Sequence, residues 1–274
     1  TPENIQVFNL GQEVALDVNL TDTNEVESIT LYGESYDSKY TDQNVYWLTV
    51  GVEAGLRIDS RSAEPSGAEL APSYNRIVRF ADDLRYRSLA PGSDDLERYF
   101  MNYLLPSQEL ARTFYVNNPS ERNRTFCASF LGYNEQGHHL VFYLNGTQIG
   151  ETWFEGFSWQ SVDLTFDAGI LLTGENTIKV VSNPLLDDMV MVDWMELEFS
   201  DTFVASTEKL SFTESTAQTW RYQVAGFVAS QGVDAYDVTS PRQPIVLTDT
   251  EFNLGTLTFQ DEIVTPKTYY LLGT

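Results

Sequence analysis

Hydrophobic and polar residues alternate with a period of two along much of the chain. The segments Thr125 to Tyr133 and Met189 to Phe199 show this most clearly, and Trp159 to Phe166 repeats it. Such a period places successive side chains on opposite faces of a β-strand. Because many short segments of this kind follow one another with turn residues between them, the pattern predicts an all-β chain with a β-sandwich in its middle.

One hairpin is specified more strongly than the rest. Leu140 to Leu144 is apolar and is followed by Asn145-Gly146, after which Thr147 to Gly150 returns. Asn-Gly suits a two-residue turn because both residues tolerate the positive φ angles that such a turn requires. We therefore expect two antiparallel strands joined at Asn145-Gly146.

The same pattern suggests three parts. Residues 1–50 read as leading strands or a partial β domain, residues 51–200 as a central β-sandwich, and residues 201–274 as a small β-sandwich. The expected fold class is thus all-β, with a central domain and small flanking immunoglobulin-like β domains.

Two stretches depart from the strand pattern. Ser60 to Tyr74 is rich in Ser, Ala, Glu and Pro without a period and is expected to be a loop. Leu96 to Leu105 follows Ser93-Asp94-Asp95 and ends at Pro106. A polar cap before an apolar run and a proline after it are helix boundaries, so this stretch predicts one helix.

The charge of the chain disfavours two classes of binding partner. The chain has 274 residues and a formal net charge of -24, from 40 acidic and 16 basic side chains. Nucleic-acid binding relies on Lys and Arg against phosphates, and anionic lipid attracts the same side chains, so both partners are disfavoured. No apolar stretch is long enough to predict a membrane-spanning helix. The acidity favours solubility, and a calcium role is the alternative.

The basic residues are unevenly distributed. Most of the arginines lie between Arg57 and Arg124, whereas the lysines are scattered. A surface with local ion pairs explains this distribution, and the alternative is an arginine-bearing face that meets an acidic neighbour.

Cys127 is the only cysteine, so no internal disulfide can form. It lies in the apolar segment Phe126 to Phe130, which predicts a buried, inert thiol. Cys127 and the pair His138-His139 are expected on adjacent strands, which would allow contact, but no motif orients them as a catalytic pair. Adjacent histidines on a strand point to opposite faces, which disfavours zinc. We expect no catalytic residues in this chain.

Two candidate binding sites remain. Trp153, Phe157 and Trp159 form an aromatic cluster after the hairpin that could stack against a carbohydrate, and packing in a core is the alternative. Trp47 and Trp194 are expected to fill cores. Asp187-Asp188 is the candidate calcium site, because calcium prefers carboxylate oxygens, and solvated loop residues are the alternative. No other cofactor is expected.

Several motifs share one resemblance. They are Tyr40 to Leu48 with Gly51 and Arg57, His138 to Val141 with Leu144 to Gly146 and Ile149-Gly150, Leu172 to Ile178, Val192 to Leu197, and Tyr222 to Phe227 with Val233 to Pro241, within which Tyr236-Asp237-Val238-Thr239-Ser240-Pro241 matches most densely. Together these motifs resemble the β region that precedes the catalytic domain in gingipain-like cysteine peptidases, and the central ones also look like a galactose-binding-type jelly roll. The resemblance implies a modular β scaffold that leads into a peptidase domain, whose catalytic His and Cys motifs are absent from this chain.

These observations favour a non-catalytic accessory region of a secreted or cell-surface bacterial peptidase that positions or targets the downstream catalytic domain, its expected partner. The near-absence of cysteine suits a bacterial exported protein. The chain starts at Thr1-Pro2 without Met and stops directly after a strand-like segment, so we expect a piece of a longer protein. The alternative is a carbohydrate-binding module, with a cell-surface glycan as its partner.

Overall fold

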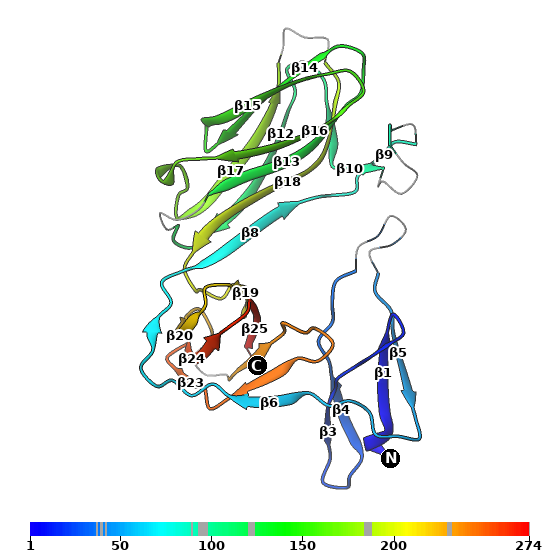
Figure 1. Ribbon diagram of the computed structural model, residues 1–274, viewed down its shortest axis with the longest axis vertical. Helices are drawn as coiled ribbons and strands as arrows, with labels where there is room; N and C mark the ends of the chain where they lie inside the picture. The colour runs from blue at the N-terminus through cyan, green and yellow to red at the C-terminus, as the bar shows by residue number, and fades with distance from the viewer. Residues whose placement is uncertain are drawn as a thin grey trace. The chain divides into compact units, whose positions relative to one another are not determined.

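The computed structural model divides the chain into two compact units. It describes residues 1–36, 38, 41, 43–88, 90–92, 98–119, 124–183, 188–228 and 232–273. The split unit comprises Thr1–Tyr74 together with Phe203–Thr274, and the inserted unit comprises Asn75–Thr202. Nearly all of the regular structure is β-strand, which confirms the predicted fold class (Figure 1).

The inserted unit is a two-sheet sandwich. Its first sheet has the strand order β16-β13-β18-β8, with β11 also paired to β18, and its second has the order β12-β17-β14-β15. The strands of the first sheet are β8 (Tyr74–Phe80), β11 (Asn102–Leu104), β13 (Thr125–Gly132), β16 (Trp159–Thr165) and β18 (Val190–Asp201). Those of the second are β12 (Glu109–Val116), β14 (Gly137–Leu144), β15 (Thr147–Glu155) and β17 (Gly174–Ser182).

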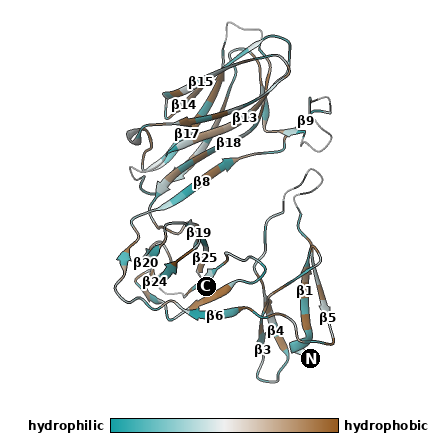
Figure 2. Cartoon of the chain, viewed as in Figure 1, coloured by the Kyte–Doolittle hydropathy of each residue, from teal (hydrophilic) through white to brown (hydrophobic). Residues whose placement is uncertain are grey.

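The core of this sandwich comes from the inward-facing residues of both sheets. Phe126, Phe130 and Phe142 are fully buried there, and Phe142 contacts both of the other two rings, with centroids 5.2 and 5.7 Å apart. Brown, hydrophobic stretches lie on strands such as β13 and β14 (Figure 2). Alternation with a period of two therefore does predict which face of each strand is buried.

The Asn145-Gly146 turn joins β14 to β15 as expected. Both residues have positive φ angles, 51° and 81°. The Asn145 side chain donates to the carbonyl oxygen of Ile170 and accepts the backbone N–H of Thr177, so it also anchors the turn to β17 and to the short helix η2 (Ala168–Ile170). The hairpin prediction is confirmed.

The predicted helix at Leu96 to Leu105 is wrong where the structure describes it. Tyr99–Phe100 is β10, which pairs with β9 (Arg85–Tyr86), and Asn102–Leu104 is β11, which pairs with β18. Residues 93–97 lie outside the described part of the chain. Phe100 and Leu104 are buried in these positions, so the tertiary burial of a short aromatic segment outweighs its helix-boundary signals.

The C-terminal part of the split unit is a second sandwich. One sheet has the order β19-β25-β21-β22-β6 and the other the order β23-β24-β20-β7. The strands of the first sheet are β6 (Asp59–Ser62), β19 (Lys209–Glu214), β21 (Val233–Asp237), β22 (Ile245–Thr248) and β25 (Lys267–Gly273). Those of the second are β7 (Glu69–Leu70), β20 (Gln218–Val224), β23 (Glu251–Asn253) and β24 (Thr256–Ile263).

Two strands of that sandwich come from the segment expected to be a loop. β6 pairs in parallel with β22, and β7 pairs in parallel with β20. Ala63, Ala71 and Tyr74 join the same core. The loop prediction for Ser60 to Tyr74 is therefore wrong at these strands. The division of the chain also differs from the expected boundary near residue 50, because residues 51–74 belong to the split unit.

The N-terminal part of the split unit holds a small three-stranded sheet and a hairpin. The sheet order is β2-β1-β5, and β3 pairs with β4. The elements are η1 (Pro2–Asn4), β1 (Ile5–Asn9), β2 (Gln12–Val14), β3 (Asp17–Leu20), β4 (Val26–Thr30) and β5 (Tyr46–Val50). Ile5, Val7 and Leu16 are the buried residues of its core.

Neither tryptophan expected in a core is buried. Trp47 lies on the edge strand β5, opposite Phe8 and on the face away from Ile5 and Val7, and is 71% exposed. Trp194 is half-buried on β18, where the guanidinium of Arg79 lies 4.4 Å from the ring centroid. Both sit on outward-facing positions, and of the two rings the structure shows a cation over that of Trp194.

A partly buried ionic cluster fixes β6 to the second sandwich. Arg61 donates to both carboxylate oxygens of Asp261, at 2.6 Å each, and to Asp237 at 2.7 Å. Lys267 donates to Asp261 at 3.0 and 3.1 Å, and the Tyr269 hydroxyl donates at 2.6 Å. Burial alone would raise the pKa of Asp261, but the hydrogen bonds from Arg61, Tyr269 and Lys267 outweigh it and hold this pKa below its usual value.

Replacing Asp261 with Asn tests this cluster. Removing the carboxylate leaves Arg61 and Lys267 without their shared partner, so we expect Asp261→Asn to lower the free energy of unfolding at neutral pH by about 3 kcal/mol. Because the folded-state pKa of Asp261 is depressed, its stabilisation is present above its unfolded pKa of about 3.9 and is lost as the pH falls through the folded value.

Urea unfolding of the wild-type chain and of Asp261→Asn, at neutral and at acidic pH, measures the difference in their free energies of unfolding. Asp163→Asn, at an exposed position on β16, is the control and should change stability by less than about 0.5 kcal/mol. Equal stability of Asp261→Asn and the wild-type chain at neutral pH would contradict the proposed contribution.

Candidate functional site

The predicted aromatic residue that lies most openly on the surface is Trp153. It is on β15, the edge strand of the second sheet of the inserted unit, and is 60% exposed. Its ring lies flat against the imidazole of His139, with centroids 3.6 Å apart and an interplanar angle of 8°. One face of Trp153 is thus supported by protein while the side chain remains accessible.

His139 is held in place on both of its ring nitrogens. The side-chain amide of Asn183 donates to Nδ1 at 2.6 Å, which leaves Nε2 to donate to Glu151 at 3.1 Å. Asn183 follows β17, and Glu151 precedes Trp153 by two residues on β15. These contacts fix the plane of the imidazole and hence the plane of Trp153.

The second histidine, His138, points to the opposite face of β14 and is fully buried. Its Nδ1 lies 2.5 Å from Asp188 Oδ1, and its Nε2 lies 3.0 Å from the carbonyl oxygen of Gly156. Phe154 packs on the ring, with centroids 4.6 Å apart. Both ring nitrogens are therefore engaged by oxygen atoms of the protein.

Asp188, one of the two candidate calcium ligands, is a buried partner of this histidine pair. Besides His138, it accepts the hydroxyl of Ser182 at 3.2 Å and the backbone N–H of His139 at 3.3 Å. Asp187 lies outside the described residues. Over the part of the chain that the structure describes, no group of three or more His, Cys, Asp or Glu side chains is arranged to hold a metal ion. Calcium at Asp187 and Asp188 stays a prediction.

The other two predicted aromatic residues lie away from Trp153. Trp159, on β16 of the first sheet, stacks on Phe100 at 5.8 Å and donates through Nε1 to the carbonyl oxygen of Pro91 at 3.0 Å. Phe157 meets Tyr133 edge to face at 6.0 Å. Trp159 is 36% exposed and Phe157 53%. They adjoin a small cluster on the outer side of the first sheet, which includes the buried residues Phe100 and Leu131.

Cys127 is not placed as a nucleophile. It lies on the outer face of β13, half-buried, between Asp163 on β16 and Glu196 on β18. Burial raises the pKa of the thiol, and these two carboxylates raise it further, which disfavours the thiolate at neutral pH. Cys127 is half-buried rather than buried as predicted, because alternation along β13 turns Phe126 and Ala128 inward and Cys127 outward.

The expected adjacency of Cys127 and the histidines is also wrong. β13 belongs to the first sheet, between β16 and β18, whereas β14 belongs to the second, between β17 and β15. The chain crosses from one sheet to the other between these strands, so a Cys–His pair does not form here.

Sequence reasoning missed His139, Glu151 and Asn183 as the support of Trp153. A regular hairpin closed by Asn145-Gly146 would place Trp153 opposite His138. The register shifts between Phe142 and Tyr143, so Trp153 lies opposite His139 instead. Gly150 marks this shift, because a Cβ there would lie 2.5 Å from a methyl group of Leu164. The glycine in β15 was the available signal.

Comparison with known proteins relates this chain to a solved structure over almost its whole length. No family model and no curated protein sequence matches. Among solved structures, dimeric latent PorU from Porphyromonas gingivalis matches 99% of this chain with a TM-score of 0.71 and 13% identity. This chain spans 29% of the length of that protein. The two chains share the fold.

Two carbohydrate-binding modules match only part of the chain. The CBM36-1 domain of a multidomain xylanase from the hindgut metagenome of Trinervitermes trinervoides covers 45% of this chain and 95% of its own, with a TM-score of 0.30 and 16% identity. A CBM36 module in complex with calcium and xylotriose covers 47% and 92%, with a TM-score of 0.27 and 14% identity. At these scores, neither match carries an argument about function.

The contacts of Asp188 lead to a prediction about calcium. Asp188→Asn removes the negative charge from a buried position and turns an amide toward His138 or Ser182, so we expect the inserted unit to lose about 2 kcal/mol of stability. Thermal unfolding in calcium chloride and in EDTA measures the effect, with Glu155→Gln as an exposed control. An equal loss in both solutions is expected. Calcium-dependent stabilisation of the wild-type chain that disappears in Asp188→Asn would identify Asp188 as a calcium ligand instead.

Proposed function

We propose that this chain is a non-catalytic β region of an exported bacterial protein, in which it positions a gingipain-like cysteine peptidase domain. The observation that carries the proposal is the fold match to PorU, which covers almost the whole of this chain but less than a third of that protein. Independently, the sequence motifs resemble the β region that precedes a gingipain-like catalytic domain. Both observations favour one segment of a multidomain protein.

The placement of the reactive residues supports a structural role. Cys127 faces outward with a raised pKa, and His138 and His139 serve as hydrogen-bonding and stacking partners within the inserted unit. No helix in the described part of the chain has the length and apolar character needed to cross a bilayer. We place the region on the cell surface or in the secreted fraction, with the downstream peptidase domain as its partner.

The test uses the full-length protein encoded by the surrounding gene. We expect Cys127→Ser to leave peptide hydrolysis unchanged, because this thiol takes no part in the chemistry. We expect Asp261→Asn, which disrupts the split unit, to lower the yield of active secreted peptidase several-fold. Peptide hydrolysis and secreted protein are measured for both variants and for the wild-type protein.

Two outcomes would overturn the proposal. One is loss of peptide hydrolysis in Cys127→Ser while the protein remains folded, since the chain itself would then be catalytic. The other is a surrounding gene that encodes no peptidase domain. Hydrolysis of peptides by the isolated chain would also overturn the proposal, because it would likewise show that the chain is catalytic.

Carbohydrate binding is a second candidate function, favoured by the geometry of Trp153. A flat, exposed indole supported from behind by His139 offers a rigid surface for a sugar ring. Glu151 lies beside it and can accept hydrogen bonds from hydroxyl groups. A glycan of the cell surface would be the ligand. Trp159 lies on the other sheet and Phe157 in the turn between β15 and β16, so the proposed platform centres on Trp153.

A glycan array tests this candidate. We expect a bound glycan to be lost on Trp153→Ala, by at least about tenfold in affinity. Trp47→Ala is the matched control, because Trp47 is comparably exposed but lies on the split unit. The array is probed with and without calcium. Absence of any hit, or hits that survive Trp153→Ala, would exclude Trp153 as a sugar platform.

A further inference from the structure

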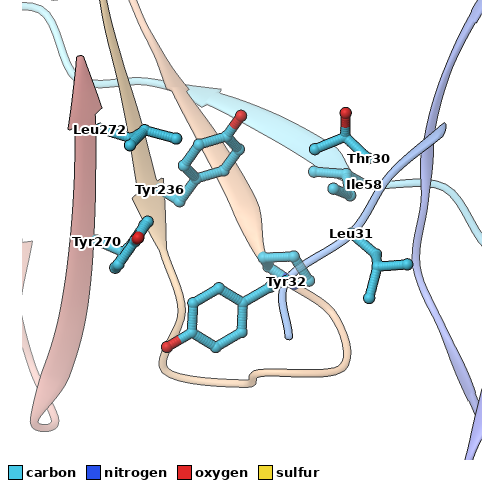
Figure 3. A pocket seen from close by; sticks show the side chains of 8 residues that line it. Thr30, Leu31, Tyr32, Ile58, Tyr236, Tyr270 and Leu272 are labelled. Carbon is cyan, nitrogen blue, oxygen red and sulfur yellow. The ribbon is translucent and has the colours of Figure 1, made fainter. Parts of the chain in front are cut away.

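The split unit carries an apolar pocket that the sequence did not suggest. It lies on the outer face of the sheet that contains β25, β21 and β22, and its volume is about 80 Å³ (Figure 3). Leu31, Tyr32, Ile58, Tyr236, Tyr270 and Leu272 are among its lining residues, and the lining is almost entirely apolar. The space suits one aliphatic side chain.

The pocket forms because a crossing segment covers the sheet incompletely. Tyr236 on β21 pairs directly with Tyr270 on β25, and both side chains alternate with buried neighbours, so they face outward. The chain leaves β4 at Thr30 and crosses this face, where the ring of Tyr32 meets that of Tyr270 edge to face at 5.7 Å. The tyrosine rings therefore form walls of the pocket rather than filling it.

Carboxylates border the pocket without cationic partners. Asp17 pairs across β3 and β4 with Thr30, and Asp234 pairs across β21 and β25 with Leu272. Both Thr30 and Leu272 line the pocket. Neither aspartate forms an ion pair with another residue of the described chain, in contrast to the acids bound by Arg61. Burial raises the pKa of Asp234, and the nearby charge of Asp17 raises it further.

We propose that this pocket binds a peptide segment of a partner protein that presents a bulky aliphatic side chain next to Lys or Arg. The aliphatic group would fill the apolar space, and the cation would relieve the repulsion between Asp17 and Asp234. A second copy of this chain fits less well, because a net charge of -24 opposes self-association at an acidic rim. This inference goes beyond the positioning role proposed above and does not depend on it.

The test uses labelled hexapeptides and the full chain in fluorescence polarisation. The probes are Gly-Ser-Leu-Arg-Ser-Gly, Gly-Ser-Leu-Glu-Ser-Gly and Gly-Ser-Ser-Arg-Ser-Gly. We expect the Leu-Arg peptide to bind at least about tenfold more tightly than the other two, with an affinity that falls as salt increases. Each peptide is titrated up to millimolar concentrations of the chain.

Two variants separate the apolar and the ionic contributions. Leu272→Trp fills the pocket and should abolish binding, while the double variant Asp17→Asn with Asp234→Asn should weaken Leu-Arg binding about tenfold. The control, Glu155→Gln with Glu175→Gln, changes the net charge equally at exposed positions of the inserted unit. Thermal midpoints confirm that each variant is folded, and the double variant keeps the test valid if Leu272→Trp does not fold.

The proposal fails if the wild-type chain does not prefer the Leu-Arg peptide, or if binding survives in folded Leu272→Trp. It also fails if sedimentation shows a dimer that Leu272→Trp dissociates, since a second copy would then occupy the pocket. If secreted peptidase activity is lost in Asp261→Asn but not in Leu272→Trp, the positioning role stands apart from peptide binding.

Discussion

The split unit depends on the contact between Arg61 and Asp261. β6 is short and exposed along much of its length, and it joins the second sandwich only in parallel with β22. The bidentate contact ties this strand to β24, and Asp237 ties it to β21. Through this cluster, β6, which precedes the inserted unit, becomes part of a sandwich in which every strand except β6 and β7 follows that unit. The Tyr236-to-Pro241 motif contributes to this cluster through Asp237. The Asp237 carboxylate accepts hydrogen bonds from Arg61 and from the backbone N–H of Thr239.

Much of the fold is readable from the sequence because its determinants are local. Alternation gives the strands and their buried faces, and Asn145-Gly146 gives a turn whose φ angles few other pairs accept. The pairing of β6 and β7, in contrast, depends on residues that are distant in the sequence. Their partners lie far along the chain, and parallel neighbours leave no hairpin signal between them. The helix prediction for Leu96 to Leu105 is wrong for a related reason. The strands in this stretch are stabilised by distant partners, β9 and β18, which a local pattern does not reveal.

In the candidate site, too, some features follow from the local sequence and others depend on distant residues. Exposure of Trp153 follows from its place on an edge strand, but its support by His139 depends on a one-residue shift of register within the hairpin. The three predicted aromatic residues are close in sequence, yet the turn after β15 carries the chain to the other sheet and separates Trp159 from Trp153. The pocket beside Tyr236 draws on β4, the residue before β6, β21 and β25, so no single segment could reveal it.

The discontinuity of the split unit has a consequence for how the protein is made. Its chain is interrupted between Tyr74 and Phe203, whose rings lie 5.3 Å apart in one core. β25 occupies a position between β19 and β21, so this sheet is incomplete until residue 273 has been synthesised. The inserted unit, by contrast, has all of its strands once residue 201 has left the ribosome. During synthesis or export, β6 and β7 therefore wait for partner strands from the end of the chain, while the inserted unit between them can fold first.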